Sequence, residues 1–337
     1  MKKKLLWIIV KYMLLALVLW FVGRSIKDNF GRIENIRLTG FDPKYMFFSV
    51  IVLFISLIFP VFAWKYLLHS LGEKINTLSA LKVWFISNLG RYFPGKVLQF
   101  AGIVYFSNKE GVSKGKAFQS VLYSQITSNG LGLLMGLALL LIKSGSENFP
   151  NAYHLSLILI ISFVAVIWFP AVFMRSSNFV LEKFKKEKIE STIAPKNYFI
   201  YIILQTANWL IMSLAFVLVI KSYTHLSLSD NPQVLLILPI SWTLGLIAVF
   251  APGGIGVREG SMSFWLSSFI PLEFALVLPW IYRILITISE IILTVIFAVS
   301  YRKPDRVNFN NSDEKERTIT DKSSLRNRIE EKENGGS

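Results

Sequence analysis

The chain has 337 residues, is 53% hydrophobic and 14% aromatic, and carries a formal net charge of +15. It has no cysteine, which excludes disulfides, thiol catalysis and thiolate metal sites. Its histidines, His69, His154 and His225, are far apart in sequence and argue against a histidine metal site. The basic residues lie in loops between apolar runs, so we expect them to face anionic lipid headgroups rather than nucleic acid.

Seven apolar segments approach or exceed the roughly 20 residues that cross a bilayer as a helix. They are Leu5–Gly23, Tyr45–Trp64, Leu131–Ile142 with its polar lead-in, Leu155–Met174, Tyr198–Ile220, Val234–Phe250 and Phe274–Ser300. They predict an all-α, polytopic integral membrane protein. The first segment follows three lysines but lacks a small-residue cleavage site, so we expect an uncleaved helix rather than a signal peptide.

Two Pro-Gly interruptions divide this apolar pattern. Arg91–Lys96 reads Arg-Tyr-Phe-Pro-Gly-Lys, and Ala251–Gly260 reads Ala-Pro-Gly-Gly-Ile-Gly-Val-Arg-Glu-Gly. In lipid, broken backbone persists only where protein or a watery cavity satisfies its polar groups. One break in each half is the pattern of a transporter built from related halves, and we expect the two breaks to meet near one cavity.

Short apolar stretches beside the breaks predict discontinuous or re-entrant helices. Leu78–Phe106 is helical in pattern on both sides of Pro94, and each part is too short to span. A re-entrant or interfacial hairpin fits best; the alternative is an amphipathic surface helix that Pro94 ends. After the second break, Ser261–Ile270 is expected to be a half-helix that supplies one more crossing. The total becomes about eight membrane-embedded segments.

The distribution of Lys and Arg predicts a cell-membrane protein with both termini in the cytoplasm. Segments 65–116 and 175–197 are rich in basic residues, whereas 143–153 and 221–233 hold one lysine each. This topology places the basic loop 24–44 outside, against the positive-inside rule.

Residues 302–337 differ in composition from the rest. They are polar, with Lys and Arg interleaved with Asp and Glu. Such a segment cannot bury enough apolar surface to offset its ordering entropy, so we predict a disordered cytoplasmic tail. The membrane domain is then 1–301.

The second break is the stronger candidate for substrate binding. Gly253, Gly254 and Gly256 allow positive φ and close approach of backbone to a ligand. Arg258 and Glu259 then open the next helix, whose N-terminus favours phosphate or carboxylate. The Arg258 guanidinium is a fork donor suited to phosphate. Glu259 would pair with a basic residue or with a coupling cation.

Four further charged residues complete the predicted binding set. Arg91 and Lys96 flank the first break. Arg283 and Glu290 lie seven residues apart in the last apolar segment and so share a helix face about 10 Å apart along the axis. That is too far for a direct bond, so each needs a partner elsewhere, with Glu259 or Arg258 expected for one of them. They are either substrate contacts or clasps that lock the helices together.

Polar residues crowd the lead-in to the third apolar segment, between Gln119 and Asn129, followed by Gly130, Gly132 and Gly136. They serve either helix packing or a polar wall of a substrate groove. The sequence has no Walker loop, no Gly-x-Ser-x-Gly elbow and no His-Glu-x-x-His pair. We therefore predict no catalytic residue, no metal and no cofactor.

These motifs resemble a known family. Pro252–Gly260 resembles the Gly-Gly-Leu-Gly-Val-Arg-Glu-Gly signature of the flippase-like membrane domain found in lysylphosphatidylglycerol synthases and in stand-alone proteins. Asn88–Lys96, followed by Glu110–Ser113, resembles its other hallmark region. The resemblance covers about residues 5–300. Where the synthases continue with Gly-Glu and a later Arg, this chain has Leu98-Gln99 and Gly102.

The resemblance implies the lipid-translocating domain without the synthase domain, since the chain ends soon after the last helix. We expect a translocase for an anionic phospholipid or a polyprenyl-phosphate-linked glycolipid, used in assembling the cell envelope. The alternatives are a membrane-embedded glycosyltransferase with a polyprenyl-phosphate sugar donor, or a non-catalytic partner of such a machine. Membrane lipids are the expected partners, and a homo-oligomer or a polysaccharide-assembly partner is left open.

Overall fold

The computed structural model describes residues 41–92, 97–143, 161, 193–227, 230–248, 251 and 254–299. The expected helices Leu5–Gly23 and Leu155–Met174, the loop 24–44 up to residue 40, and the expected tail 302–337 lie outside these ranges, apart from the single residue Ile161. The chain divides into two units, Met1–Ala298 and Val299–Ser337. The helices below belong to the first unit, and the last of them ends at its boundary.

All regular elements in the described part of the chain are helical, which confirms the all-α fold. Listed in chain order, they are α3 (Pro43–Ser70), α4 (Thr77–Asn88), the short 3-10 helix η2 (Leu89–Tyr92), α5 (Val97–Lys109), α6 (Lys114–Lys143), α9 (Pro195–Tyr223), α10 (Asn231–Ile247), α11 (Val257–Leu266) and α12 (Leu272–Val299).

Four of these helices, α3, α6, α9 and α12, are long and apolar enough to cross a membrane. Each has 28–30 residues. At about 1.5 Å per residue they exceed the roughly 30 Å of a bilayer's hydrocarbon core. The protein is therefore an integral membrane protein with several spans.

Local sequence accounts for where the helices begin. The Asp42 side chain accepts a hydrogen bond from the Lys44 N–H at 2.9 Å, and Asn76 does the same for the Leu78 N–H at the start of α4. Pro43 and Pro195 occupy the first positions of α3 and α9, where the missing N–H is harmless. The polar residues before Leu131 belong to α6. Their side chains can be inside the bundle because they form hydrogen bonds there, as Ser120 and Ser128 do.

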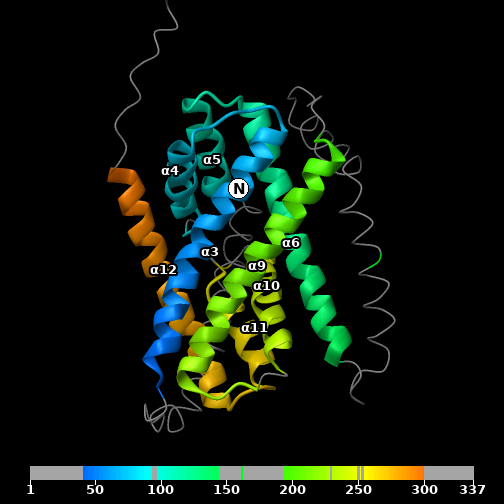
Figure 1. Ribbon diagram of the computed structural model, residues 1–337, viewed down its shortest axis with the longest axis vertical. Coiled ribbons are helices and arrows are strands. Elements are labelled where there is room, and N and C mark those ends of the chain that lie inside the picture. Colours follow the sequence, from blue (N-terminus) through cyan, green and yellow to red (C-terminus); the bar gives the residue numbers. More distant parts are fainter. Residues whose placement is uncertain are drawn as a thin grey trace, which may run out of the picture. The chain divides into compact units, whose positions relative to one another are not determined.

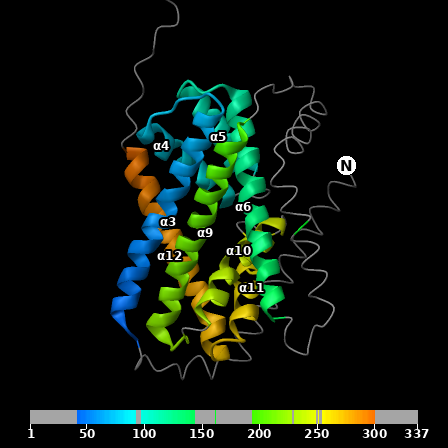
Figure 2. The same cartoon turned by 45° about the vertical axis from the view of Figure 1, so that its right-hand side comes forward.

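Two sets of four helices repeat the same order with opposite direction (Figures 1 and 2). In the first set, the short helices α4 and α5 stand between the long helices α3 and α6 in chain order. In the second set, α10 and α11 stand between α9 and α12. The pair α4–α5 lies at the end where α3 finishes, and α10–α11 lies at the other end, where α9 finishes. This is the arrangement of an inverted repeat.

Both pairs of short helices are hairpins packed into the bundle. In α4, Val83 and Phe85 are buried, and Phe85 stacks on Phe297 of α12 with ring centroids 5.3 Å apart. This contact with α12 packs α4 against the other helices, whereas a helix on the membrane surface would leave one face in solvent or headgroups. The structure therefore favours the hairpin interpretation of Leu78–Phe106 over the surface helix.

The second hairpin differs from the expectation. We expected Val234–Phe250 to span and Ser261–Ile270 to cross back. Instead α10 has 17 residues, α11 has ten and begins at Val257, and the two lie side by side at one end (Figure 1). Ten residues extend only about 15 Å, too short to cross. The hairpin enters and leaves on the same side.

Small residues allow the helices to approach closely. Gly132 and Gly136 of α6 face α10: a Cβ on Gly132 would overlap Thr243 and lie 2.8 Å from the Pro239 carbonyl oxygen. A Cβ on Gly136 would lie 2.5 Å from the Ile240 side chain. This spacing of two glycines four apart is typical of membrane helix contacts. The packing interpretation is therefore correct for these glycines.

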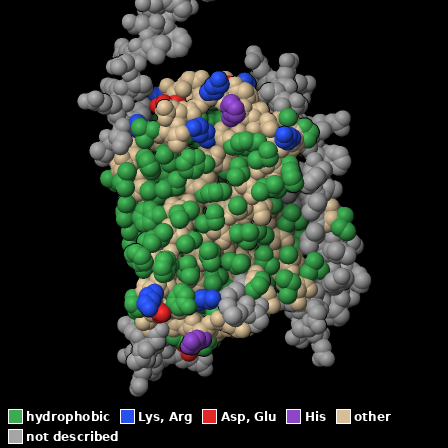
Figure 3. Space-filling view, viewed as in Figure 1, with side chains coloured by type: hydrophobic (Ala, Val, Ile, Leu, Met, Phe, Trp, Pro, Cys, Tyr) green, Lys and Arg blue, Asp and Glu red, His purple; other side chains and the backbone are tan. Residues whose placement is uncertain are grey.

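The surface matches a bilayer environment. Figure 3 shows a broad band of hydrophobic side chains, with charged and histidine side chains gathered at the two ends of this face. Large apolar side chains are exposed on the outward faces of α3, α9 and α12, among them Phe47, Phe48, Ile203, Ile288 and Val295. Their exposure indicates contact with lipid tails. The orientation of the two ends remains a prediction.

Candidate functional site

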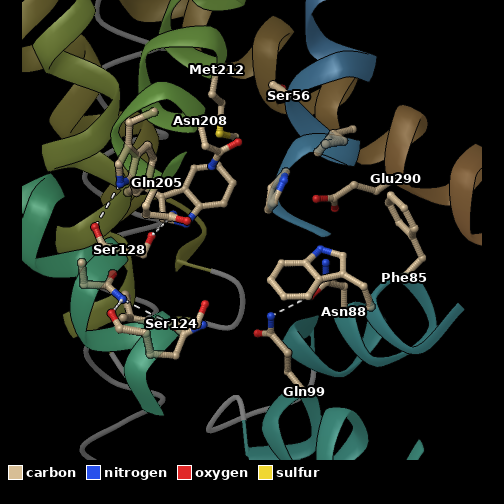
Figure 4. A pocket seen from close by; sticks show the side chains of 18 of the residues that line it. Ser56, Phe85, Asn88, Gln99, Ser124, Ser128, Gln205, Asn208, Met212 and Glu290 are labelled. Atoms are coloured by element: carbon tan, nitrogen blue, oxygen red, sulfur yellow. Dashed lines mark hydrogen bonds between the residues drawn. The ribbon is translucent and has the colours of Figure 1, made fainter. Parts of the chain in front are cut away.

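A cavity lies where the two hairpins and the four long helices meet (Figure 4). All eight described α-helices contribute to it. Its volume is about 130 Å³, the space of about four waters in the liquid, and too small for lipid tails. The lining residues are Ser56, Leu57, Pro60, Trp84, Phe85, Asn88, Gln99, Ser124, Gln125, Ser128, Asn129, Gln205, Asn208, Trp209, Met212, Trp242, Leu246, Arg258 and Glu290.

One wall of the cavity comes from α6 and α9. Ser124, Gln125, Ser128 and Asn129 recur at helical spacing on α6, so they share one face that lines the cavity. The Gln205 Nε2 group of α9 donates to the Ser128 hydroxyl oxygen at 2.9 Å. The polar lead-in therefore serves both roles that its sequence left open. Its other face packs into the bundle, where the Trp64 Nε1–H donates to the Ser120 hydroxyl at 3.0 Å.

The opposite wall comes from α3, α4, α5 and α12 (Figure 4). The Gln99 Nε2 group donates to Asn88 Oδ1 at 2.8 Å, which joins the two arms of the first hairpin. Gly90 makes this possible, because a Cβ there would lie 2.5 Å from the Gln99 backbone nitrogen. Residues next to the first break are thus held at the cavity.

The second hairpin closes through a glycine contact. Gly254 has φ +71°, and a Cβ on it would lie 2.8 Å from the Gly245 carbonyl oxygen. Gly256 has φ +83° and precedes α11. Only glycine adopts such a backbone readily and also allows this approach. The turn brings α11 back beside α10.

The turn aims Arg258 into the cavity. This residue is 7% exposed, and its guanidinium carbon lies 3.4 Å from the centre of the Trp242 ring, a cation–π geometry. A Cβ on Gly245 would lie 3.2 Å from the Arg258 Cβ, so the glycine makes room for the arginine. Among the lining residues that the structure describes, Glu290 of α12 carries the opposite charge.

Glu259 and Arg283 form a separate ion pair. Glu259 Oε1 accepts from Arg283 Nη1 at 3.0 Å, and Oε2 accepts from the Gly256 N–H at 2.7 Å. The two side chains are 1% and 12% exposed. Glu259 therefore caps α11 and ties it to α12. We expected Glu259 or Arg258 to be the partner of either Arg283 or Glu290, and the structure pairs Glu259 with Arg283 in the geometry of a structural clasp.

The predicted site residues thus fall into three groups. Arg258 and Glu290 line the cavity. Glu259, Arg283, Gly254 and Gly256 build the turn and hold it. The structure does not describe Gly253, Lys96 or the side chain of Arg91, so their predicted contacts stay predictions, as does the approach of Pro94 to the second break. The flanking residues Asn88, Gln99 and Arg258 do line one cavity.

Sequence reasoning missed several lining residues. Gln205 and Asn208 of α9 are buried polar residues three apart, and Trp209 and Trp242 lie beside them. The pair of amides inside an otherwise apolar span was an available signal. The described residues also contain no group of three or more potential metal ligands among His, Cys, Asp and Glu.

Comparison with protein families gives one result. The family model for the lysylphosphatidylglycerol synthase TM region matches residues 8–293. The match spans most of the chain, so the chain belongs to this family, as its two motifs indicated. A search of curated proteins finds no match.

The buried ion pair yields a stability prediction. Arg283→Met should lower the free energy of unfolding by about 3–5 kcal/mol, because it leaves the Glu259 carboxylate buried without its cation. Adding Glu259→Gln should recover much of the loss, since the amide oxygen still accepts from Gly256 and no charge remains. Unfolding in detergent micelles measures both variants.

The control is the more exposed pair of Lys116 and Glu73, 3.4 Å apart. Lys116→Met should cost only about 0–1 kcal/mol. If the double variant is less stable than Arg283→Met alone, the clasp assignment is wrong.

Proposed function

We propose that this member of the lysylphosphatidylglycerol synthase TM region family moves an anionic lipid between the two leaflets of its membrane. The headgroup passes through the cavity and the tails stay in the bilayer. The observation that carries the proposal is a cavity lined by six carboxamides and by buried Arg258 and Glu290, placed where two oppositely directed hairpins meet.

The polar lining is expensive in an apolar bundle. Charged and amide groups withdrawn from water lose hydration, so in membrane proteins they usually mark a pathway for an ion or a substrate. Here they come from α4, α5, α6, α9, α11 and α12 and converge on one space. Packing alone would be served better by apolar side chains.

Arg258 is the group that would bind a headgroup phosphate. Its guanidinium carries a permanent charge and a fork of donors that matches phosphate oxygens. Trp242 supports one face of the guanidinium, and Gly245 leaves it room. Glu290 balances this charge in the cavity before cargo enters, which lowers the cost of burying Arg258.

The inverted repeat supports passage through the membrane. In transporters of this design the substrate site lies between repeats, and the discontinuous helices on either side open alternately. The hairpins α4–α5 and α10–α11 hold these positions, one toward each end (Figures 1 and 2).

The transferase alternative needs an acidic general base, and Glu259 in the second break is the residue that the sequence offers for it. Both Glu259 oxygens already accept hydrogen bonds, from Arg283 and from Gly256, and Glu259 does not line the cavity among the described residues. A general base must reach the proton it removes. We therefore favour translocation without chemistry on the lipid.

Reconstitution in liposomes tests the proposal. The purified chain should equilibrate fluorescent anionic lipids across the bilayer without ATP, and mass spectrometry should recover each lipid unchanged. A new lipid product formed by the purified chain from a polyprenyl-phosphate sugar would overturn the proposal in favour of the transferase. Movement of no lipid in the panel would favour the role of a non-catalytic partner.

Substitution of Arg258 tests the phosphate-binding role most directly. Arg258→Ala should slow lipid movement by roughly 10- to 100-fold, because a hydrogen bond to a charged group contributes about 1.5–3 kcal/mol. Arg258→Lys should restore only part of the rate, since lysine keeps the charge and loses the fork. The measurement is the initial rate of fluorescent lipid exchange.

Lys116→Ala serves as the control, since it removes a basic residue that pairs with Glu73 and does not line the cavity. Gel filtration checks that each variant accumulates and folds. An Arg258→Ala variant with the wild-type rate would rule out the phosphate role.

A further inference from the structure

We propose that the cavity recognises a sugar linked to the lipid phosphate, rather than the glycerol or amine headgroup of a plain phospholipid. The inference takes from the proposed function the premise that a lipid headgroup enters the cavity. It adds the chemical class of that headgroup. Four features of the lining carry it.

The first feature is the number of carboxamides. Six line the cavity, from α4, α5, α6 and α9: Asn88, Gln99, Gln125, Asn129, Gln205 and Asn208. A carboxamide both donates and accepts hydrogen bonds, as a hydroxyl does. An ammonium only donates and an ionised phosphate only accepts. Together with the three serines of the lining, these groups match a headgroup with many hydroxyls.

The second feature is that these amides are held in place. Gln99 bonds to Asn88 at 2.8 Å across the first hairpin, and Gln205 bonds to Ser128 at 2.9 Å across α9 and α6. Asn129 donates to the Gln125 backbone oxygen at 2.6 Å. Each carboxamide has two donors and two lone pairs, so one bond orients it and leaves further capacity for a ligand.

The third feature is Asn208. It is 6% exposed, and its Oδ1 atom has no hydrogen-bond partner among the described residues. A buried acceptor without a donor is costly, so such atoms in native proteins usually meet a ligand or water. Figure 4 shows Asn208 on the wall opposite Glu290. A sugar hydroxyl between these walls would donate to either one.

The fourth feature is aromatic. Trp84, Trp209 and Trp242 all line the cavity. Arg258 covers one face of Trp242, which places the phosphate site beside this ring. The face of an indole is electron-rich, so the C–H groups on one side of a sugar ring pack well against it. Half-buried Trp84 and buried Trp209 supply such surfaces on the two walls.

The charges divide accordingly. Arg258 takes the phosphate, and the Glu290 carboxylate can accept from a sugar hydroxyl. A headgroup of two or more phosphates near Glu290 would meet like charge. The site therefore suits one phosphate at Arg258 with an uncharged sugar beyond it.

Two matched probes test the proposal. Pentyl glucosyl phosphate and pentyl glyceryl phosphate have the same charge, the same phosphodiester and the same tail, and they differ only in sugar against glycerol. Isothermal titration to the purified chain in detergent should give a Kd at least tenfold lower for the glucosyl compound. Equal or tighter binding of the glyceryl compound would overturn the inference.

Variants assign the preference to the amides. Asn208→Ala, or Gln99→Ala from the other wall should the first not fold, should bring the two Kd values together by weakening only the glucosyl compound. Arg258→Ala should weaken both compounds alike. The matched control is Ser213→Ala, which removes a buried hydroxyl of α9 that does not line the cavity and should change neither Kd. If the amide variants weaken both compounds equally, the sugar site is wrong.

The outcomes separate the inference from the proposed function. A chain that moves phosphatidylglycerol in liposomes but binds both probes alike keeps the function and loses the sugar preference. A chain that prefers the glucosyl probe but moves no lipid keeps the sugar site and loses translocation.

Discussion

The contact between Gly245 and Gly254 is the constraint on which the rest of the structure depends. A chain that turns back inside an apolar bundle must satisfy its own backbone and still pack without gaps. At the second hairpin, glycines with positive φ bring the turn against the end of α10. At the first, Gly90 packs on the start of α5. Each close approach delivers one side chain to the cavity, Gln99 from the first hairpin and Arg258 from the second.

Neighbouring residues on α11 have opposite tasks because successive positions on a helix point about 100° apart. Arg258 points into the cavity and rests on Trp242. Glu259 points away, caps its own helix and holds Arg283 of α12. The pair of Glu259 and Arg283 therefore fixes the hairpin, while Arg258 and Glu290 line the cavity. This division lets a charged residue face the cavity while the buried ion pair of Glu259 and Arg283 stays intact.

The sequence predicted those parts that depend on local or regional pattern. Long apolar runs predicted α3, α9 and α12, and the first Pro-Gly break predicted the hairpin of α4 and α5, because length and backbone chemistry are readable residue by residue. The prediction failed where packing between helices distant in sequence determines the structure. Val234–Phe250 looks like a span, and only its contact with α11 makes it half of a hairpin. The roles of Gln205 and Asn208 become visible only when α6 lies beside them and the first hairpin lies across the cavity. The sequence predicted that Glu259 or Arg258 would pair with one of Arg283 and Glu290, and only the packing of α11 against α12 shows that the pair is Glu259 with Arg283.

The central claim is that the cavity communicates with both sides of the membrane, and cysteine accessibility tests it most directly. The chain has no cysteine, so a single substitution has no background. Ser124→Cys places a thiol on the cavity wall, and Ser213→Cys places one on a buried part of α9 that does not line it. In proteoliposomes, the account predicts that a membrane-impermeant thiol reagent labels Ser124→Cys from either side and Ser213→Cys from neither. Labelling of Ser124→Cys from one side only, or from neither, would contradict it.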